Sequence, residues 1–300
     1  MLKTAKCQCC ESVDFTVNMV KTSLAKRGGA NAYMCQRCAR ENRQYHTSNN
    51  EIQGKQKVNA VSTGIEWEMS FSDDYARNTL FAYGLIPTHD CSLRSEGDGS
   101  RYGWDGNACE YVTGIMQGLN IASKMCATID TLIRDGHASI NNSCGTHFHV
   151  SINSMRDEHG AKTYMGYIQR FYNSLFVPLC EVMQANPATT ERVFGRYFDH
   201  HYCTTVNAGT YAGDRYNFIN VTNDSNIEFR LNKFTSAKQY QNLMKMEVEM
   251  VQAIVTNFCE HFNDEKIDTR RYENKTAYRK HKAQVTAKKL VKIFEKYANK

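Results

Sequence analysis

The sequence of 300 residues contains no apolar run approaching the length that a helix needs to cross a lipid bilayer, about 20 residues. Its first residues, Met-Leu-Lys-Thr-Ala-Lys, also lack the apolar stretch of a secretory signal peptide. Hydrophobic residues make up 41% of the chain and charged residues 23%, which is typical of a soluble globular protein. We therefore expect a cytoplasmic protein with no membrane partner.

The chain also lacks a P-loop. The motif Gly-x-x-x-x-Gly-Lys-Ser/Thr, whose backbone amides cradle phosphates, occurs nowhere in the sequence. An ATP site in this chain must therefore be built from a sheet and its metal ions. There is no internal repeat and no low-complexity tract either, so the length favours one ordinary domain with a small appendage.

Positive charge is scarce in the middle of the chain and concentrated at both ends. Lys and Arg outnumber Asp and Glu by 10 to 4 in residues 1–57 and by 12 to 3 in residues 266–300, whereas residues 58–265 hold 15 basic and 24 acidic side chains. Metal ions would offset part of the acidic excess. The basic ends indicate contact with an acidic partner, and nucleic acid is the candidate.

Twelve cysteines would indicate disulfides in a small secreted protein, but in a cytoplasmic chain of this size paired spacings indicate metal ligands. Two Cys-x-x-Cys pairs, Cys7 with Cys10 and Cys35 with Cys38, are separated by a polar, basic segment. Four thiolates close a tetrahedral Zn²⁺ site, which folds a segment too small for its own core. Cys9 leaves the ligands of the first pair open, and the alternatives are a redox pair or a coincidental cluster.

Composition and apolar periodicity divide the chain into four parts. These are a zinc-binding module at 1–45, a polar linker at 46–60, a catalytic domain at 61–265 and a basic C-terminal helical tail at 266–300. Apolar residues at helical spacing predict long helices at 115–134, 161–184, 235–262 and 285–297.

The stretch Gly64 to Phe71, Gly-Ile-Glu-Trp-Glu-Met-Ser-Phe, has the alternation of a strand. Glu66 and Glu68 share one face, and the apolar side chains take the other. Neighbouring carboxylates raise each other's pKa unless a positive group lies between them, and a divalent metal ion is a common one. The alternative is a surface strand with solvated glutamates.

Further stretches repeat this pattern of a polar and an apolar strand face. His147 and His149 share a face in residues 144–151, and Glu228 and Arg230 share one in residues 226–231. Asp90 and Glu110 lie at the ends of two more expected strands. The fold class that we predict is α+β: a curved, mostly antiparallel sheet with helices on one face and the active site on the other.

These motifs, taken in order, resemble those of the amidoligase family. They are Gly-x-Glu-x-Glu, Asp-x-Ser-Leu, Glu-x-Val-Thr, Cys-Gly-x-His-x-His-Val-Ser, Arg-Tyr and Glu-Phe-Arg, and they span about residues 60 to 232. That family is related to glutamate-cysteine ligase and glutamine synthetase within the carboxylate-amine ligase superfamily. One departure is Cys91, which stands where the family's Asp-Gly-Ser motif has glycine and puts the local turn in doubt.

The resemblance implies an ATP-dependent ligase that forms an amide or peptide bond and releases ADP and phosphate. It implies shared Mg²⁺ or Mn²⁺ sites on Glu66, Glu68, Asp90, Glu110, His147 and Glu228. Arg230 would contact the transferred phosphoryl group, while Arg196 and Arg215 would face phosphate or substrate. The residues expected to carry catalysis are Glu66, Glu228, Arg230 and Arg215.

A carboxylate is a poor electrophile, so an amine cannot displace its oxygen usefully in water. Transfer of the γ-phosphoryl group of ATP gives an acyl phosphate that an amine can attack, and the protein's part is positioning and charge neutralisation. Mg²⁺ prefers hard oxygen ligands, which a face of carboxylates supplies. His149 is ambiguous: it could orient a neighbouring ligand, contact substrate or be a core histidine.

Two other functions are open. His147, His149 and one carboxylate could form the site of a metal hydrolase or oxygenase, although Asn153 stands where a cupin-like site would have glutamate. The chain could also be a nucleic-acid-binding zinc protein with a degenerate catalytic body. Cys144 next to the histidines could suggest a nucleophile, but its place on the apolar face favours a buried structural cysteine.

Overall fold

The computed structural model describes most of the chain from residue 61 onward and four short strands before it. The described residues are 4–6, 13–15, 19–21, 33–35, 61–71, 75–76, 79–80, 85–88, 93, 108–113, 116–152, 160–198, 203–222, 226–262 and 274–300. The chain forms two compact units, one made of residues 1–55, 64–117 and 127–144 and the other of residues 56–63, 118–126 and 145–300. The linker predicted at 46–60 and the residues Asp90, Cys91, Asn153, His200 and His201 lie outside the described residues.

The first unit contains two small hairpins and a group of antiparallel strands around β5. In the hairpins β1 (Thr4–Lys6) pairs with β2 (Val13–Phe15), and β3 (Met19–Lys21) pairs with β4 (Tyr33–Cys35). The strand β5 (Val61–Phe71) pairs with β7 (Ala108–Val112), which pairs with β6 (Ile86–Thr88). The short strands β8 (Met116–Gln117) and β9 (Ala138–Ser139) also pair with β5.

The predicted alternation of β5 is present, but both of its faces are buried. Ile65, Trp67 and Met69 have no exposed surface, as expected for the apolar face. Glu66 and Glu68 are only 6% and 5% exposed. The alternative of a surface strand with solvated glutamates is therefore wrong.

The described part of the second unit after residue 144 combines three antiparallel strands with five helices. The strand β10 (Thr146–Ile152) pairs with β12 (Ile227–Phe229), which pairs with β11 (Ile219–Asn220). The helices are α4 (Gly160–Arg170), α5 (Tyr172–Ala185), α6 (Pro187–Phe194), α7 (Ala237–Phe262) and α8 (Lys275–Ala298). Antiparallel pairing in both units, together with these helices, makes the fold α+β, as predicted.

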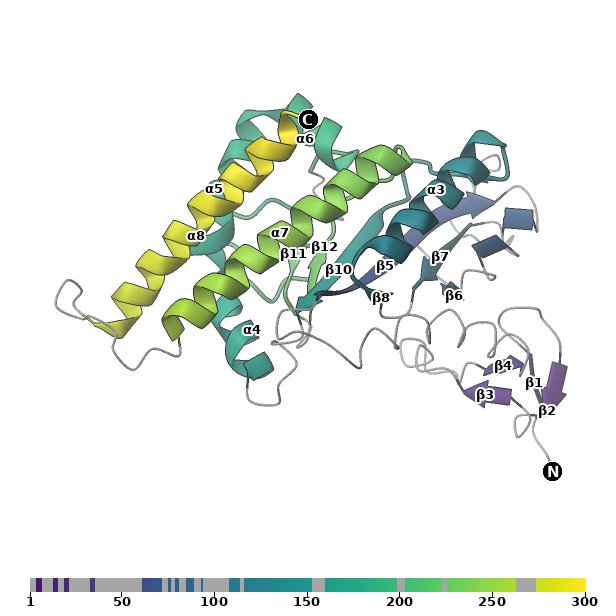
Figure 1. Cartoon of the computed structure of the whole chain (residues 1–300), viewed down its shortest axis with the longest axis horizontal. Helices are drawn as coiled ribbons and strands as arrows, with labels where there is room; N and C mark the ends of the chain where they lie inside the picture. The colour runs from purple at the N-terminus through teal and green to yellow at the C-terminus, as the bar shows by residue number, and fades with distance from the viewer. Residues whose placement is uncertain are drawn as a thin grey trace. The chain divides into compact units, whose positions relative to one another are not determined.

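Helices α5, α7 and α8 form the packed body of the second unit. Helix α8 lies along both α5 and α7, and Figure 1 shows α7 and α8 side by side. Helix α7 packs against β10, whose Phe148 and Val150 have no exposed surface. Thr146, the first residue of β10, is held from both sides, because its N–H donates to the Asn232 carbonyl and its carbonyl accepts from the Tyr240 hydroxyl.

Helix boundaries differ from the predictions at two breaks. The helix predicted at 115–134 begins only at Asn120, as α3 (Asn120–Arg134), because Gly118 adopts a φ of 68° between it and β8. The helix predicted at 161–184 is divided into α4 and α5 at Phe171, whose φ of −107° and ψ of 17° are not helical.

The two C-terminal helices agree more closely with the predictions. The helix predicted at 235–262 is α7, and the one predicted at 285–297 is α8, which starts earlier because the Asn274 side chain accepts the Ala277 N–H as an N-cap. None of the described helices is both long and apolar enough to span a membrane.

Candidate functional site

Three strands of the second unit carry a row of polar side chains. Register places His149 of β10 opposite Glu228 of β12, and Glu228 opposite Asn220 of β11. Directly paired residues of antiparallel strands point to the same side of a sheet. The neighbouring row, Phe148, Phe229 and Ile219, is apolar and buried. The face predicted from alternation is therefore present in this unit.

Glu228 is the centre of this polar row. Its side chain is only 8% exposed, and both of its carboxylate oxygens accept hydrogen bonds. The Nη1 of Arg230 donates to Oε1 at 2.5 Å, and the Nδ2 of Asn220 donates to Oε2 at 2.6 Å. The Nδ1 of His147 lies 3.5 Å from Oε1. A buried carboxylate requires such partners because burial without them is costly.

His149 lies beside the same carboxylate. One of its ring nitrogens and a carboxylate oxygen of Glu228 are within 4.8 Å of one another. Its Nδ1 lies 3.1 Å from Oδ1 of Asn226. With that oxygen as acceptor, Nδ1 carries the proton and Nε2 keeps the lone pair of the neutral ring. This tautomer suits a histidine that binds a metal ion or substrate through Nε2.

The first unit has its own group of buried acids. Glu66 and Glu68 lie on β5 and Glu110 on β7, and none of the three is more than 9% exposed. Register pairs Glu68 directly with Glu110. Two carboxylates in direct register repel each other, and a divalent cation between such groups offsets the repulsion. The residue types and their burial therefore fit a cation that prefers oxygen ligands.

The predicted arginines occupy three different settings. The Arg230 side chain is only 11% exposed and forms the ion pair with Glu228. Arg196 is half-buried and follows Gly195 at the end of α6. Arg215 is exposed, and its guanidinium lies 5.2 Å from the centre of the Tyr216 ring.

Several predicted metal ligands lie outside the described residues. These are Asp90 and the cysteines Cys7, Cys9, Cys10 and Cys38. Cys35 is the last residue of β4 and is half-buried. Cys144 has no exposed surface, which agrees with a buried structural cysteine.

Two polar residues of the site were not singled out by the sequence analysis. Asn220 bonds Glu228, and Asn226 bonds His149. Asn220 belongs to β11, which is only two residues long and therefore too short to give an alternation signal. Asn226 lies at the edge of that motif and carries no periodic signal of its own.

Comparisons with known proteins give a limited result. No protein-family model matches the chain, and no curated protein does. Among the solved structures that match is one described as "GmaS/ADP complex-Conformation 1", with 14% sequence identity, 90% of this chain and 75% of that chain covered, and a TM-score of 0.40. A likeness of that degree carries no functional argument.

Proposed function

We propose that the chain is an ATP-dependent carboxylate-amine ligase that requires Mg²⁺ or Mn²⁺. The observation that carries the proposal is the buried Glu228 carboxylate, which lies within reach of two histidines, an arginine and an asparagine from neighbouring strands. The buried acids of β5 and β7 support it, because their burial and register suit metal ions. The ordered motifs described above name the same residues.

In this proposal Glu66, Glu68, Asp90, Glu110, His147 and Glu228 hold the divalent ions. Bound there, the ions would neutralise charge on the phosphate oxygens of ATP. Arg230, Arg215 and Arg196 would add positive charge around the same phosphates. Arg230 is already bound to Glu228, so its guanidinium is fixed in orientation before a nucleotide arrives. His149, with Nε2 as its basic nitrogen, would contact the substrate.

The reaction would proceed in two displacements. An oxygen of the substrate carboxylate attacks the γ-phosphorus of ATP, and ADP leaves. The amine then attacks the acyl carbon, phosphate leaves with that carboxylate oxygen, and the amine nitrogen loses a proton. The polar strand face would hold both substrates in line and lower the charge repulsion between carboxylate and triphosphate.

Oxygen-18 transfer tests this proposal. The full chain is incubated with Mg²⁺, ATP and a cell extract whose carboxylates carry oxygen-18. We expect ADP, phosphate containing one labelled oxygen, and new condensed masses. Glu228→Gln and Glu66→Gln should abolish turnover while the thermal unfolding transition persists, since each removes charge but little volume. AMP and pyrophosphate as products would contradict the acyl phosphate.

A second candidate is a metal hydrolase built on His147, His149 and Glu228, favoured by the closeness of both rings to that carboxylate. The same extract without ATP distinguishes the two candidates. A hydrolase would consume a substrate under that condition, whereas a ligase would be inactive. Metal-dependent cleavage without ATP would replace the first proposal with this one.

We further propose that Cys7, Cys10, Cys35 and Cys38 bind a structural Zn²⁺ ion. The support is the two Cys-x-x-Cys spacings and the position of Cys35 at the end of a short hairpin strand. A site closed by four thiolates has no open coordination position. Its role would be to fold the module or to contact a partner, with no part in the ligase chemistry.

A further inference from the structure

The strand β10 carries one more polar side chain on the face of its two histidines. Side chains alternate along a strand, so Ser151 points to the same side as His147 and His149, two residues beyond His149. Ser151 is only 3% exposed, similar to the 6% of Glu228, which lies opposite His149 in the register. It is therefore part of the enclosed polar face around Glu228, and the proposed reaction gives it no role.

The hydroxyl group of Ser151 is buried, and it has no hydrogen-bond partner within the described part of the chain. A buried hydroxyl without a partner lowers stability, because it has lost its hydrogen bonds to water. An alanine could occupy the same position on β10 without that cost. A ligand that bonds the hydroxyl therefore explains this serine better than the fold does.

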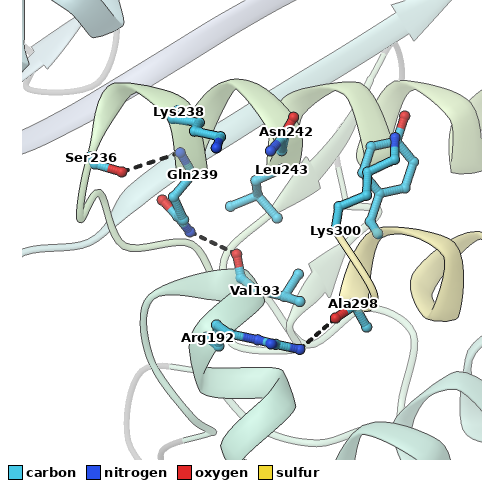
Figure 2. Close-up of a pocket in the computed structure, with 10 residues that line it drawn as sticks. Arg192, Val193, Ser236, Lys238, Gln239, Asn242, Leu243, Ala298 and Lys300 are labelled. Atoms are coloured by element: carbon cyan, nitrogen blue, oxygen red, sulfur yellow. Dashed lines mark hydrogen bonds between the residues drawn. The ribbon is translucent and has the colours of Figure 1, made fainter.

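Polar side chains elsewhere in the second unit show the structural alternative. Beside the cavity where α6, α7 and α8 meet, Arg192 donates to the Ala298 carbonyl (Figure 2). At the same place Gln239 donates to the Val193 carbonyl at 2.6 Å. These bonds join separate elements, so the side chains that form them stabilise the fold. Ser151 forms no such bond with the residues that the structure describes.

Ser151 lies at the end of the polar face that is away from the strong charges. The carboxylate of Glu228 is turned to Arg230 and Asn220, which bind its two oxygens. His147, beside the same carboxylate, is four residues from Ser151, or about 13 Å along the strand. Metal ions and phosphate oxygens are expected beside those charges. Ser151 is thus suited to an uncharged part of the substrates.

The two substrates of the proposed ligation differ in charge. The carboxylate is an anion and suits the charged end of the face, whereas the amine must be neutral when it attacks the acyl carbon. A neutral amine presents N–H donors, and a serine oxygen has two lone pairs that can accept one. The Nδ1 of the neighbouring His149 is held by Asn226 at 3.1 Å, which leaves the lone pair of the neutral ring on Nε2 as a second acceptor.

We propose that Ser151 is a substrate-binding residue that holds the amine of the ligation beside His149, with its Oγ accepting an N–H of that amine. This inference rests on the proposed function and adds which end of the polar face receives the amine. The serine forms no covalent bond during the reaction. Its removal should therefore weaken the binding of the amine and leave the binding of ATP unchanged.

Hydroxylamine, a small amine that converts an acyl phosphate to a hydroxamate, tests this role. The full chain is incubated with Mg²⁺, ATP and the carboxylates of the cell extract, and hydroxamate and ADP are measured as the hydroxylamine concentration is varied. Ser151→Ala should raise the KM for hydroxylamine by about threefold to tenfold, the usual effect of one lost hydrogen bond. The KM for ATP should not change.

Thermal unfolding gives a second readout that does not depend on turnover. Because Ser151→Ala removes an unpaired buried hydroxyl, its melting temperature should equal that of the parent or exceed it by up to about 2 °C. Thr146→Val is the matched control. Thr146 is also completely buried, and its hydroxyl has no partner in the described ranges, but it points to the opposite, apolar face of β10. This variant should leave both KM values unchanged.

Each outcome decides the role of Ser151. An unchanged KM for hydroxylamine in Ser151→Ala, an equal rise in the KM for ATP, or a melting temperature lower by more than about 2 °C would overturn it. The same rise in the KM for hydroxylamine in Thr146→Val would also overturn it, since any change in β10 would then have that effect. A parent protein that forms no hydroxamate with ATP would overturn the ligase proposal and this inference together, whereas an active parent that Ser151→Ala matches would overturn this inference alone.

Discussion

At the scale of single residues, Glu247 is a carboxyl group in the middle of α7 with no exposed surface. The Nδ2 of Asn232, which is also completely buried, donates to its Oε2 at 3.1 Å. Burial raises the pKa of Glu247 well above the ordinary value of 4.5, and the Asn232 hydrogen bond only partly opposes this. The folded protein therefore binds a proton at Glu247 that the unfolded chain releases at lower pH.

This residue should make stability fall as pH rises. Below pH 4.5 both states are protonated; above it, the unfolded state alone releases the proton, and the free energy of unfolding drops by up to about 1.4 kcal/mol per pH unit until the folded pKa is reached. Glu247→Gln keeps an acceptor for Asn232 but cannot ionise. We expect it to raise stability at pH 7 by more than about 1 kcal/mol, measured by urea unfolding between pH 4 and pH 8.

Glu249→Gln is the matched control for this prediction. Glu249 lies on the same helix, but its side chain is 37% exposed and pairs with Lys296 at 2.7 Å. Its replacement should give no stabilisation that grows with pH. A Glu247→Gln variant whose stability changes with pH in parallel with the parent would contradict a buried, protonated Glu247.

Residue patterns predicted which side chains share a strand face but not which partners they bind. Period-two alternation paired His147 with His149 and Glu228 with Arg230. Both histidines and Arg230 lie close to the Glu228 carboxylate, which confirms that these side chains share a face. Glu247 was not predicted, because helical periodicity does not distinguish a buried acid from an exposed one. Long-range packing of α7 decides that.

At the scale of secondary-structure elements, Gly195 determines how α6 ends. It has a φ of 78°, and a Cβ at this position would lie 2.1 Å from the Lys233 carbonyl oxygen. The neighbouring backbone is fixed, because the Lys233 N–H donates to the Phe194 carbonyl at 2.7 Å. Only glycine fits both the left-handed backbone and this close approach.

Gly195→Ala should therefore destabilise the protein by about 2–4 kcal/mol, the sum of left-handed strain and a backbone clash. Gly136→Ala is the control, because Gly136 has a φ of 80° but nothing within 4 Å of the added Cβ. It should cost only about 1 kcal/mol. Chemical denaturation of both variants measures the difference, and equal losses would show that the approach of Lys233 is not limiting.

Helix α8 presents a basic face that could meet nucleic acid. Lys288, Lys289 and Lys292 are exposed, while Leu290 and Phe294 are buried against the unit. A fourth lysine of α8, Lys296, pairs instead with Glu249. The charge of Lys296 is therefore partly offset by a carboxylate, whereas Lys288, Lys289 and Lys292 face solvent.

We predict weak, sequence-tolerant binding of DNA or RNA at low ionic strength that falls steeply with salt through counterion release. Replacing Lys288, Lys289 and Lys292 by Gln should reduce both the affinity and its salt slope. Lys296→Gln should have a smaller effect, because Glu249 already offsets its charge. Fluorescence anisotropy of a labelled oligonucleotide measures this. Absence of binding at low salt would leave the face simply solvated.

The ends of the helices were predicted less well than their existence. Apolar periodicity continues across Phe171, so α4 and α5 read as one helix in the sequence. The break is a backbone event at one residue, with no proline or glycine to signal it. Where a proline is present, at Pro187, the predicted end at residue 184 lies next to the observed end of α5 at Ala185.

At the scale of the whole molecule, the N-terminal module should be separable from the ligase chemistry. Purified protein should contain one Zn²⁺ per chain, and Cys35→Ser or Cys38→Ser should lose it. Deletion of residues 1–50 should preserve ATP-dependent turnover, because a closed thiolate site takes no part in catalysis. Metal analysis by mass spectrometry checks the first point and an ADP assay the second.

Cys203→Ser provides the control for the zinc measurement. Cys203 is buried in the second unit, so its replacement should leave the zinc content unchanged. Protein purified without chelator that contains no zinc would contradict the site. Loss of turnover on deleting residues 1–50 from a protein that remains folded would give the module a catalytic part.

Both backbone groups of Thr146 form hydrogen bonds with residues that the ribosome adds much later, Asn232 and Tyr240. The residues that hold the start of β10 lie far along the chain, Tyr240 being 94 residues after Thr146. At about 5–20 residues per second, roughly 5–20 s pass between the appearance of His147 and that of its support. During that interval the nascent chain carries both histidines without the frame that aligns them. The polar face around Glu228 therefore cannot be complete until α7 has been synthesised, and a chain truncated before that helix would lack the Tyr240 contact that holds the start of β10.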